Sequence, residues 1–118
     1  MEQVDLGKSS TGIDPKVAAL LSYLAGIISG IVFYVIEKEN KFVRFHAMQS
    51  IIVFGALLAL HIVNIAVLGM FLPWGLRGLV SAIINLGGLA LWIILMIKAY
   101  QGEYFKLPIA GDIAEKKA

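Results

Sequence analysis

"AMQSIIVFGALLALHIVNIAVLGMFLPWGL", residues Ala47–Leu76, contains no Asp, Glu, Lys or Arg. Two further runs, Val17–Ile36 and Gly78–Ile97, share this property. An α-helix needs about 20 predominantly apolar residues to cross the hydrocarbon core of a bilayer. Each of the three runs is long enough, so the sequence predicts three transmembrane helices.

The composition of the whole chain agrees with a membrane protein. Hydrophobic residues make up 59% of the 118 residues and charged residues only 15%, against roughly 45–50% and about 25% in ordinary soluble domains. The mean hydropathy is +0.85, so too few polar residues are present to cover a soluble surface. The length fits a single domain.

Local signals place the ends of the predicted helices. Asp14 is a good N-cap, and Pro15 is tolerated in a first helical turn. The "LPWG" sequence at Leu72–Gly75 ends the second helix, because Pro and Gly break helices. That helix is longer than the apolar core, so its first two turns are interfacial. We expect an all-α, three-helix membrane bundle made of a flexible polar tail (1–13), helices over 14–37, 41–70 and 78–101, and a cytoplasmic tail (102–118).

Three spans would place the two termini on opposite sides of the membrane. The first loop and the C-terminal part hold seven Lys and Arg residues, and the N-terminal tail with the Pro73 turn holds three. Cations concentrate on the cytoplasmic side of membrane proteins. We therefore expect a multi-pass protein of the cell membrane with its N-terminus outside and its C-terminus in the cytoplasm.

Small residues recur at helical spacing in two of the runs. Such residues allow close contact between helices in lipid, and we expect them to contact neighbouring helices, either within the chain or in a homo-oligomer or another membrane protein. The residues concerned are Ser22, Gly26 and Gly30 in the first helix and Ser81, Asn85 and Gly88 in the third. The alternative is a polar pathway through the bilayer, lined by His61, Asn64, Asn85 and Arg77.

His61 has two interpretations. An ionisable side chain at membrane depth is costly and usually faces protein or water, so His61 could relay protons or bind a ligand. The preferred alternative is a neutral imidazole hydrogen-bonded to a neighbouring helix through Asn64 or Asn85. The apolar runs contain no acidic partner for a proton relay, which favours the second interpretation.

Catalytic and metal-binding patterns are missing from the sequence. It has no cysteine, no H-E-x-x-H, no G-x-S-x-G and no P-loop. His46 and His61, the two histidines, lie about 22 Å apart along one predicted helix. Glu37 and Glu39 have lysines nearby and are expected to be solvated. We expect no enzyme activity, no metal, no cofactor and, from the net charge of only +2, no nucleic-acid partner.

The segment "KFVRFHAMQS" (Lys41–Ser50) places polar side chains where the second helix enters the bilayer. His46 and Gln49 are three residues apart and share a helix face. Arg44 projects from another side and can reach lipid headgroups or Asp112. We predict a polar cluster of Arg44, His46, Gln49 and Ser50 that holds the returning C-terminal tail.

Two motifs carry a resemblance to a known family. "FVRFHAMQS" and the closing "GEYFKLPIAGDIAE" resemble a family of small archaeal and bacterial membrane proteins of unknown function, distantly similar to the twenty-kilodalton inner-envelope component of the chloroplast protein-import translocon. The resemblance runs from about Ile13 to Glu115 and implies no catalytic residues. The matching positions are Arg44, Phe45, His46, Ala47, Gln49 and Ser50, and, in the tail motif, Tyr104, Pro108, Gly111 and Asp112.

These observations predict a non-enzymatic integral membrane protein that acts through helix packing and partner binding. The resemblance suggests a subunit of a translocation or envelope complex. The alternative is a small channel or transporter, which would need several copies because three helices cannot enclose an aqueous path.

Overall fold

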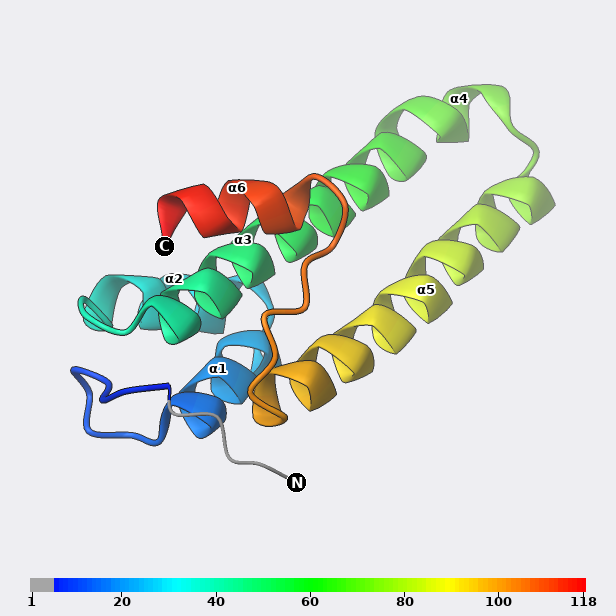
Figure 1. Cartoon of the computed structure of the whole chain (residues 1–118). Helices are drawn as coiled ribbons and strands as arrows, with labels where there is room; N and C mark the ends of the chain where they lie inside the picture. Colours follow the sequence, from blue (N-terminus) through cyan, green and yellow to red (C-terminus); the bar gives the residue numbers. More distant parts are fainter. Residues whose placement is uncertain (1–5) are drawn as a thin grey trace.

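A long antiparallel pair of helices forms the frame of the protein (Figure 1). The computed structural model describes residues 6–118, and the regular elements in that range are all helices. Helix α3 (Lys41–Val63) continues through a π-helical turn (η1, Asn64–Leu68) into the short α4 (Gly69–Phe71), and α5 (Trp74–Tyr100) returns beside it. Both Lys41–Phe71 and Trp74–Tyr100 are long and apolar enough to cross a membrane.

The predicted break between these helices is confirmed. Helix α4 ends at Phe71 with Leu72 as its C-cap, and Pro73 precedes α5, so the chain reverses at the Pro73 turn. Helix α5 begins at Trp74, four residues before the predicted start. We call this end of the hairpin the tip, and the end where α3 begins and α5 finishes the open end.

The prediction of one continuous helix over residues 14–37 is wrong. Asp14 and Pro15 do begin a helix, with the Asp14 carboxylate accepting from the Lys16 amide at 2.9 Å. However, α1 (Pro15–Leu24) ends after ten residues and α2 (Ile27–Ile36) starts in a new direction. Gly26 between them has φ +63° and ψ −128°, a conformation that glycine adopts readily and that costs other L-residues about 1–3 kcal/mol.

The reversal at Gly26 is held by one hydroxyl group. The Ser29 Oγ atom accepts from the Ala25 amide and donates to the Ser22 carbonyl, both at 2.9 Å. These bonds satisfy backbone groups that an unbroken helix would have paired. The structure therefore has two membrane-length helices and a short helical hairpin, rather than three spanning helices.

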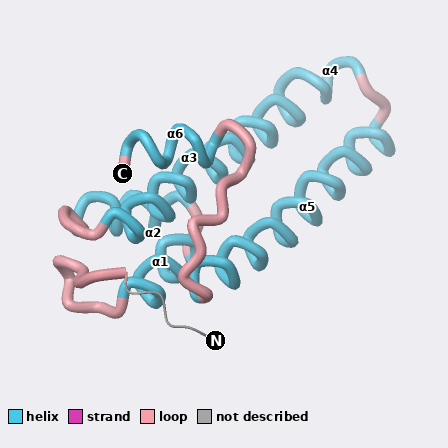
Figure 2. Tube along the Cα trace, viewed as in Figure 1, coloured by secondary structure: helices cyan, strands magenta, loops and turns pink. Residues whose placement is uncertain are grey.

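The α1–α2 hairpin returns to the open end from which it starts. The Ser10 amide, before α1, donates to the Glu37 carboxylate after α2 at 2.8 Å. The Asn40 side chain donates to the Leu6 carbonyl at 2.8 Å. Helix α2 packs on α3, and α1 packs on both α3 and α5, as the tube in Figure 2 shows.

The segment 102–118 folds back on the protein instead of leaving it as a tail. It runs along α3, turns at Ile109, which has φ +68°, and forms α6 (Ala110–Lys117). Helix α6 packs on α3, and the Tyr34 hydroxyl donates to the Lys117 carbonyl at 2.7 Å. Leu6 and Lys117 thus both lie at the open end, whereas the three-span prediction separates the termini.

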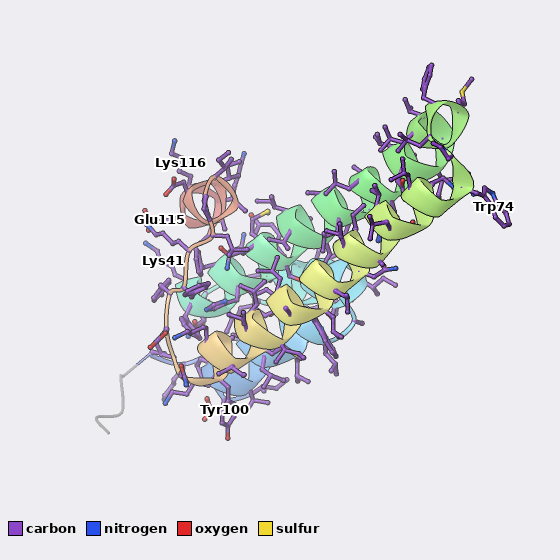
Figure 3. All side chains as sticks on the ribbon, turned by 90° about the vertical axis from the view of Figure 1, so that its right-hand side faces the viewer. Lys41, Trp74, Tyr100, Glu115 and Lys116 are labelled. Carbon is purple, nitrogen blue, oxygen red and sulfur yellow. The ribbon has the colours of Figure 1, made fainter. Side chains whose placement is uncertain are left out.

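Buried side chains concentrate in the half of the molecule near the open end. The core cluster joins α1, α3 and α5 and consists of Ala19, Tyr23, Phe42, Val53, Leu95 and Ala99. Toward the tip the large apolar side chains point outward (Figure 3), and Trp74 is 85% exposed. Apolar surface on this scale is stable where lipid rather than water surrounds it.

Candidate functional site

His46 lies fully buried where α3 meets α1 and the returning C-terminal segment. Asn40 starts this helix as its N-cap and accepts from the Val43 amide at 3.1 Å. The His46 Nε2 atom lies 2.8 Å from the Glu103 carbonyl oxygen, and Nδ1 lies 2.6 Å from the Tyr23 hydroxyl. A carbonyl can only accept, so Nε2 carries the proton and Nδ1 accepts from Tyr23.

Gln49, one turn further along α3, uses both ends of its amide. Its Nε2 atom donates to the Tyr23 hydroxyl at 3.0 Å and to the Phe105 carbonyl at 2.9 Å. Its Oε1 atom accepts from the Leu107 amide at 3.0 Å. Tyr23, His46 and Gln49, here called the His46 cluster, thus bind the backbone of residues 103–107.

Aromatic rings enclose the His46 cluster. The rings of Phe42 and Phe45 meet the imidazole edge-on, with centroids 4.6 and 5.0 Å away. The Tyr104 ring packs edge-on against the Phe42 ring, with the two ring centroids 5.0 Å apart. Water is excluded from such a site, where a polar group that loses its partner costs about 1–3 kcal/mol. The bonds of the cluster therefore fix the position of the C-terminal segment.

Arg44 and Ser50 do not belong to this cluster, although the sequence placed them there. The Arg44 Nη1 atom donates to the Tyr34 and Glu37 carbonyls at 2.9 and 2.6 Å, which closes the C-terminus of α2. Its guanidinium carbon also lies 4.1 Å from the centre of the Tyr34 ring. The Ser50 hydroxyl donates to the Gly26 carbonyl at 3.0 Å and ties α3 to the hairpin turn.

Glu37 is buried rather than solvated, contrary to the sequence-based expectation. Its Oε2 atom accepts from the Ser10 amide and hydroxyl and from the amides of Glu39 and Asn40. Burial raises the pKa of this carboxyl, but the hydrogen bonds from Ser10, Asn40 and Glu39 lower it below its ordinary value overall. Glu37 therefore joins the segment before α1 to the start of α3 as a carboxylate.

Two of these residues could not be identified from sequence patterns alone. For Tyr23 the sequence offered one weak indication: a tyrosine lies within an apolar run, and a buried tyrosine hydroxyl usually needs a hydrogen-bond partner. Glu37 had no comparable signal, since its ligands come from backbone amides in two separate segments.

Two of the four residues of the tail motif, Pro108 and Gly111, shape the turn into α6. The Ala110 amide donates to the Pro108 carbonyl at 2.7 Å, and a Cβ on Gly111 would lie 2.5 Å from Lys106. Tyr104 covers Phe42, and Asp112 is exposed in the first turn of α6. The hydrogen bond from Lys106 to Glu115 raises the pKa of the lysine, as do the negative charges nearby.

The predicted small-residue stripe of the first helix lies at real helix contacts. A Cβ on Gly30 would lie 3.0 Å from the Ala47 carbonyl oxygen, and one on Gly26 would lie 3.5 Å from the Phe54 ring. The Ser22 hydroxyl, in contrast, bonds to the Ala18 and Ala19 carbonyls of its own helix. Here the glycines, and not the serine, set the distance between α2 and α3.

The stripe of the third helix is only partly in contact with other helices of the chain. A Cβ on Gly88 would lie 3.4 Å from Leu57, and Ser81 accepts from the Asn64 side chain at 2.6 Å. Gly88 therefore faces α3, and Ser81 faces the π-helical turn η1. Asn85, in contrast, is exposed, and within residues 6–118 its side chain makes no hydrogen bond.

The intramembrane polar residues do not form one pathway. Asn64 is buried in the π-helical turn, and its Oδ1 atom has no partner among the described residues. His61 is half-buried and forms no side-chain hydrogen bond in the same range. In residues 6–118 no group of three or more His, Asp or Glu side chains is arranged to hold a metal ion.

The segment that carries these contacts also defines the family of the chain. The magnetosome magnetite crystal formation protein family matches residues 14–114, from the start of α1 into α6. The chain belongs to this family. Its matched region contains the His46 cluster, both membrane-length helices and the tail motif.

Archaeal membrane proteins are similar along almost the whole chain. A UPF0132 membrane protein of Methanocaldococcus jannaschii is 50% identical over 111 residues, which cover 94% of each chain. Another, from Archaeoglobus fulgidus, is 45% identical over 102 residues, covering 86% of this chain and 93% of the relative. No solved structure matches the chain.

These relatives confirm the predicted resemblance to small archaeal membrane proteins. They do not include the chloroplast import component, so that more distant likeness stays a prediction.

Proposed function

We propose that this protein is a non-enzymatic integral membrane protein that crosses the bilayer twice, through α3–α4 and α5. Along α5, Arg77 and Lys98 are 21 residues apart, about 31 Å of helix. The hydrocarbon core is about 30 Å thick, so these two cations would mark its boundaries. The exposed apolar side chains between them would contact lipid. The short α1–α2 hairpin would then enter the membrane from the open end and return to it.

The distribution of charge carries this proposal. Of the ten Lys and Arg residues, only Arg77 lies near the tip. The other nine lie at the open end, where Figure 3 shows Lys41 and Lys116 far from Trp74. By the positive-inside rule, the open end would be cytoplasmic. Both termini would face the cytoplasm, in place of the N-outside arrangement expected from three spans.

Single cysteines test this topology, because the natural chain has none. Lys8→Cys, Gly75→Cys and Lys116→Cys would each be treated with a membrane-impermeant thiol reagent. In intact cells only Gly75→Cys should react, whereas the other two should react after permeabilisation. Labelling of Lys8→Cys, but not Lys116→Cys, in intact cells would restore the three-span arrangement and reject our proposal.

The cytoplasmic surface supports a role in partner binding. The His46 cluster fixes residues 103–107. Ile109, just before α6, and Ile113, within α6, are then 75% and 40% exposed. A rigid segment with exposed apolar side chains loses little conformational entropy when a partner binds. The protein would act as a subunit that anchors a translocation or envelope complex to the membrane.

Photo-crosslinking can test partner binding in native membranes. A photoreactive amino acid at Ile113 should give discrete protein adducts, whereas the same group at Ile28, on the outward face of α2, should give mainly lipid adducts. His46→Ala should reduce the Ile113 adducts by loosening the segment. Equal adduct patterns at both positions would argue against a partner surface on α6.

A channel formed by several copies is the second candidate function. Asn64 and Ser81 place polar atoms within the span, and the Asn64 Oδ1 atom has no partner among the described residues. Solute or proton flux in liposomes that contain the purified protein would favour this function if Asn64→Leu abolished it. Absence of flux would leave the anchoring role.

A further inference from the structure

The turn of the α1–α2 hairpin exposes apolar side chains and keeps its polar groups inside. Leu24 is 53% exposed and Ile28 is 67% exposed, and no charged residue occurs in the run Val17–Ile36. The Gly26 carbonyl accepts from the Ser50 hydroxyl at 3.0 Å, in addition to the hydroxyl-mediated bonds of the turn described above. Lipid offers no hydrogen bonds to a bend in the chain. A turn with satisfied backbone groups and an apolar outer surface therefore fits hydrocarbon rather than water.

A contact with α5 shows how far the hairpin reaches along the frame. The Trp92 Nε1 atom donates to the carbonyl of Tyr23, next to the end of α1, at 2.7 Å. Trp92 lies six residues from Lys98, about 9 Å along α5, and fifteen from Arg77, about 22 Å. The midplane of the hydrocarbon core is about 15 Å from each boundary. The hairpin therefore stays within the leaflet at the open end.

The two leaflets thus hold different amounts of protein. Of the helices in residues 6–118, α1, α2, α3 and α5 pack together in the leaflet at the open end, whereas the α3–α4 arm and α5 alone continue through the other leaflet to the tip. Helix α6 also lies beside α3 toward the open end (Figure 1). A helix with its side chains is about 10–12 Å wide. The cross-section of the protein is therefore about twice as large in the leaflet at the open end.

Helix α2 forms part of the outer wall of this wider half. Its buried residue, Gly30, faces α3, and its opposite side exposes Ile31, Val32 and Val35 by 47%, 46% and 62%. The lipid of that leaflet covers these side chains. A helix that enters only one leaflet displaces lipid there and not in the other, and its insertion therefore depends on membrane curvature.

We propose that the protein is a membrane wedge, which prefers and stabilises bilayers curved with the leaflet at the open end on the convex side. Lipid headgroups spread apart on a convex surface, so the two additional helices fill space that they would have to open in a flat bilayer. The partner recognised is the curved lipid bilayer itself. This role rests on the two-span insertion proposed above, which places the hairpin in one leaflet.

Thin membrane tethers pulled outward from giant vesicles test the curvature preference. The purified protein carries a dye on Lys116→Cys, and an impermeant quencher added outside leaves only the signal of molecules whose open end faces the lumen. Molecules with the open end outside should be at least about twofold denser in the tether than in the vesicle wall, because the outer leaflet of a tether is convex. Molecules with the open end inside should be depleted from the tether. Equal density in tether and wall for both orientations would overturn the proposal.

A charge near the turn tests whether the hairpin is the wedge. The lysine of Ile28→Lys seeks the headgroups, which draws the hairpin out of the hydrocarbon and should abolish the enrichment in tethers. Val35→Lys is the matched control, because Val35 is similarly exposed on α2 but lies near its boundary end. Unchanged enrichment in a folded Ile28→Lys variant would contradict the wedge. The opposite behaviour of the two orientations needs no substitution in the hairpin, so it decides the question even where Ile28→Lys fails to fold.

Two outcomes separate the wedge from the two-span topology. Labelling of Lys8→Cys, but not Lys116→Cys, in intact cells would reject both, because α1 and α2 would then cross both leaflets. Confirmed two-span labelling with equal density in tether and wall would reject the wedge alone. A nitroxide on Leu24→Cys that collides with a water-soluble nickel chelate more often than with oxygen would also reject it, because the turn would then lie in water.

Discussion

The Nε2 atom of His46 lies 2.8 Å from the carbonyl oxygen of Glu103, a residue 57 positions later in the chain. This bond joins the start of one membrane-length helix to the segment that leaves the other. Together with the Gln49 bonds to residues 105 and 107, it makes a side-chain clamp on an extended backbone. The clamp gives His46 and Gln49 of α3 a structural role.

His46→Ala should release the C-terminal segment. The substitution removes the donor to the Glu103 carbonyl and the acceptor of the Tyr23 hydroxyl proton, although the Tyr23 oxygen still accepts from Gln49. Each buried group that loses its partner costs about 1–3 kcal/mol. Tryptic cleavage after Lys106 should therefore become faster in detergent or in membranes. His61→Ala is the control, since His61 forms no side-chain hydrogen bond within residues 6–118. The same cleavage rate in both variants and the natural protein would contradict the clamp.

Gly30→Leu should force α2 away from α3. A Cβ at this position already lies 3.0 Å from the Ala47 carbonyl oxygen and 3.1 Å from Ser50, so a larger side chain has no room. Overpacking of this kind costs about 1–3 kcal/mol, measurable as a lower melting temperature in detergent. Gly87→Leu adds the same side chain where no atom lies within 4 Å and should leave the monomer intact. An unchanged melting temperature for Gly30→Leu would mean that α2 does not contact α3.

Gly26→Ala should destabilise the turn of the α1–α2 hairpin for a different reason. The added methyl group has room, because its nearest neighbour would be Phe54 at 3.5 Å. The backbone conformation, φ +63° and ψ −128°, is the obstacle, since such sparsely populated conformations cost about 1–3 kcal/mol for an L-residue. A thermal unfolding experiment should therefore show a loss for Gly26→Ala but a neutral effect or a gain for Gly87→Ala. A gain in both would indicate that residues 15–36 form one continuous helix.

Glu37 should make stability depend on pH in the acidic range. Its pKa is lower in the folded protein than its ordinary value of 4.5, so its carboxylate stabilises the fold above that value. This contribution decreases as the pH falls below about 4.5 and disappears once the carboxyl is protonated in the folded protein. Glu37→Gln should therefore be less stable than the natural protein at pH 7, and the difference should shrink toward pH 3. An equal difference at both pH values would argue against this carboxylate network.

The fold class and the two longest helices follow from the sequence by local physics. Runs without charge identify segments that can cross a membrane, and Pro73 ends α4 where its ring interrupts helical geometry. Asp14 and Pro15 begin α1 because side chains next to the helix end satisfy its first amides. The sequence also predicts that His46 and Gln49 share a helix face, since three residues span nearly one helical turn.

Other features depended on tertiary structure. The hydropathy of Val17–Ile36 is the same whether Gly26 continues a helix or reverses it. The choice is made by the Ser29 bonds and by packing of both short helices on α3. That reversal moves the described N-terminal residues to the same end as the C-terminus.

Spacing within one helix predicted that His46 and Gln49 act together, but not which groups they bind. Their partners are a tyrosine hydroxyl of α1 and backbone atoms of residues 103–107. Backbone atoms are chemically alike in every residue, so no side-chain pattern marks them in advance. The sequence by itself determined that the chain is a membrane protein and that polar residues lie at the N-terminal end of α3. The three-dimensional arrangement alone decided what that end holds, because contacts distant in sequence form only after the helices have packed.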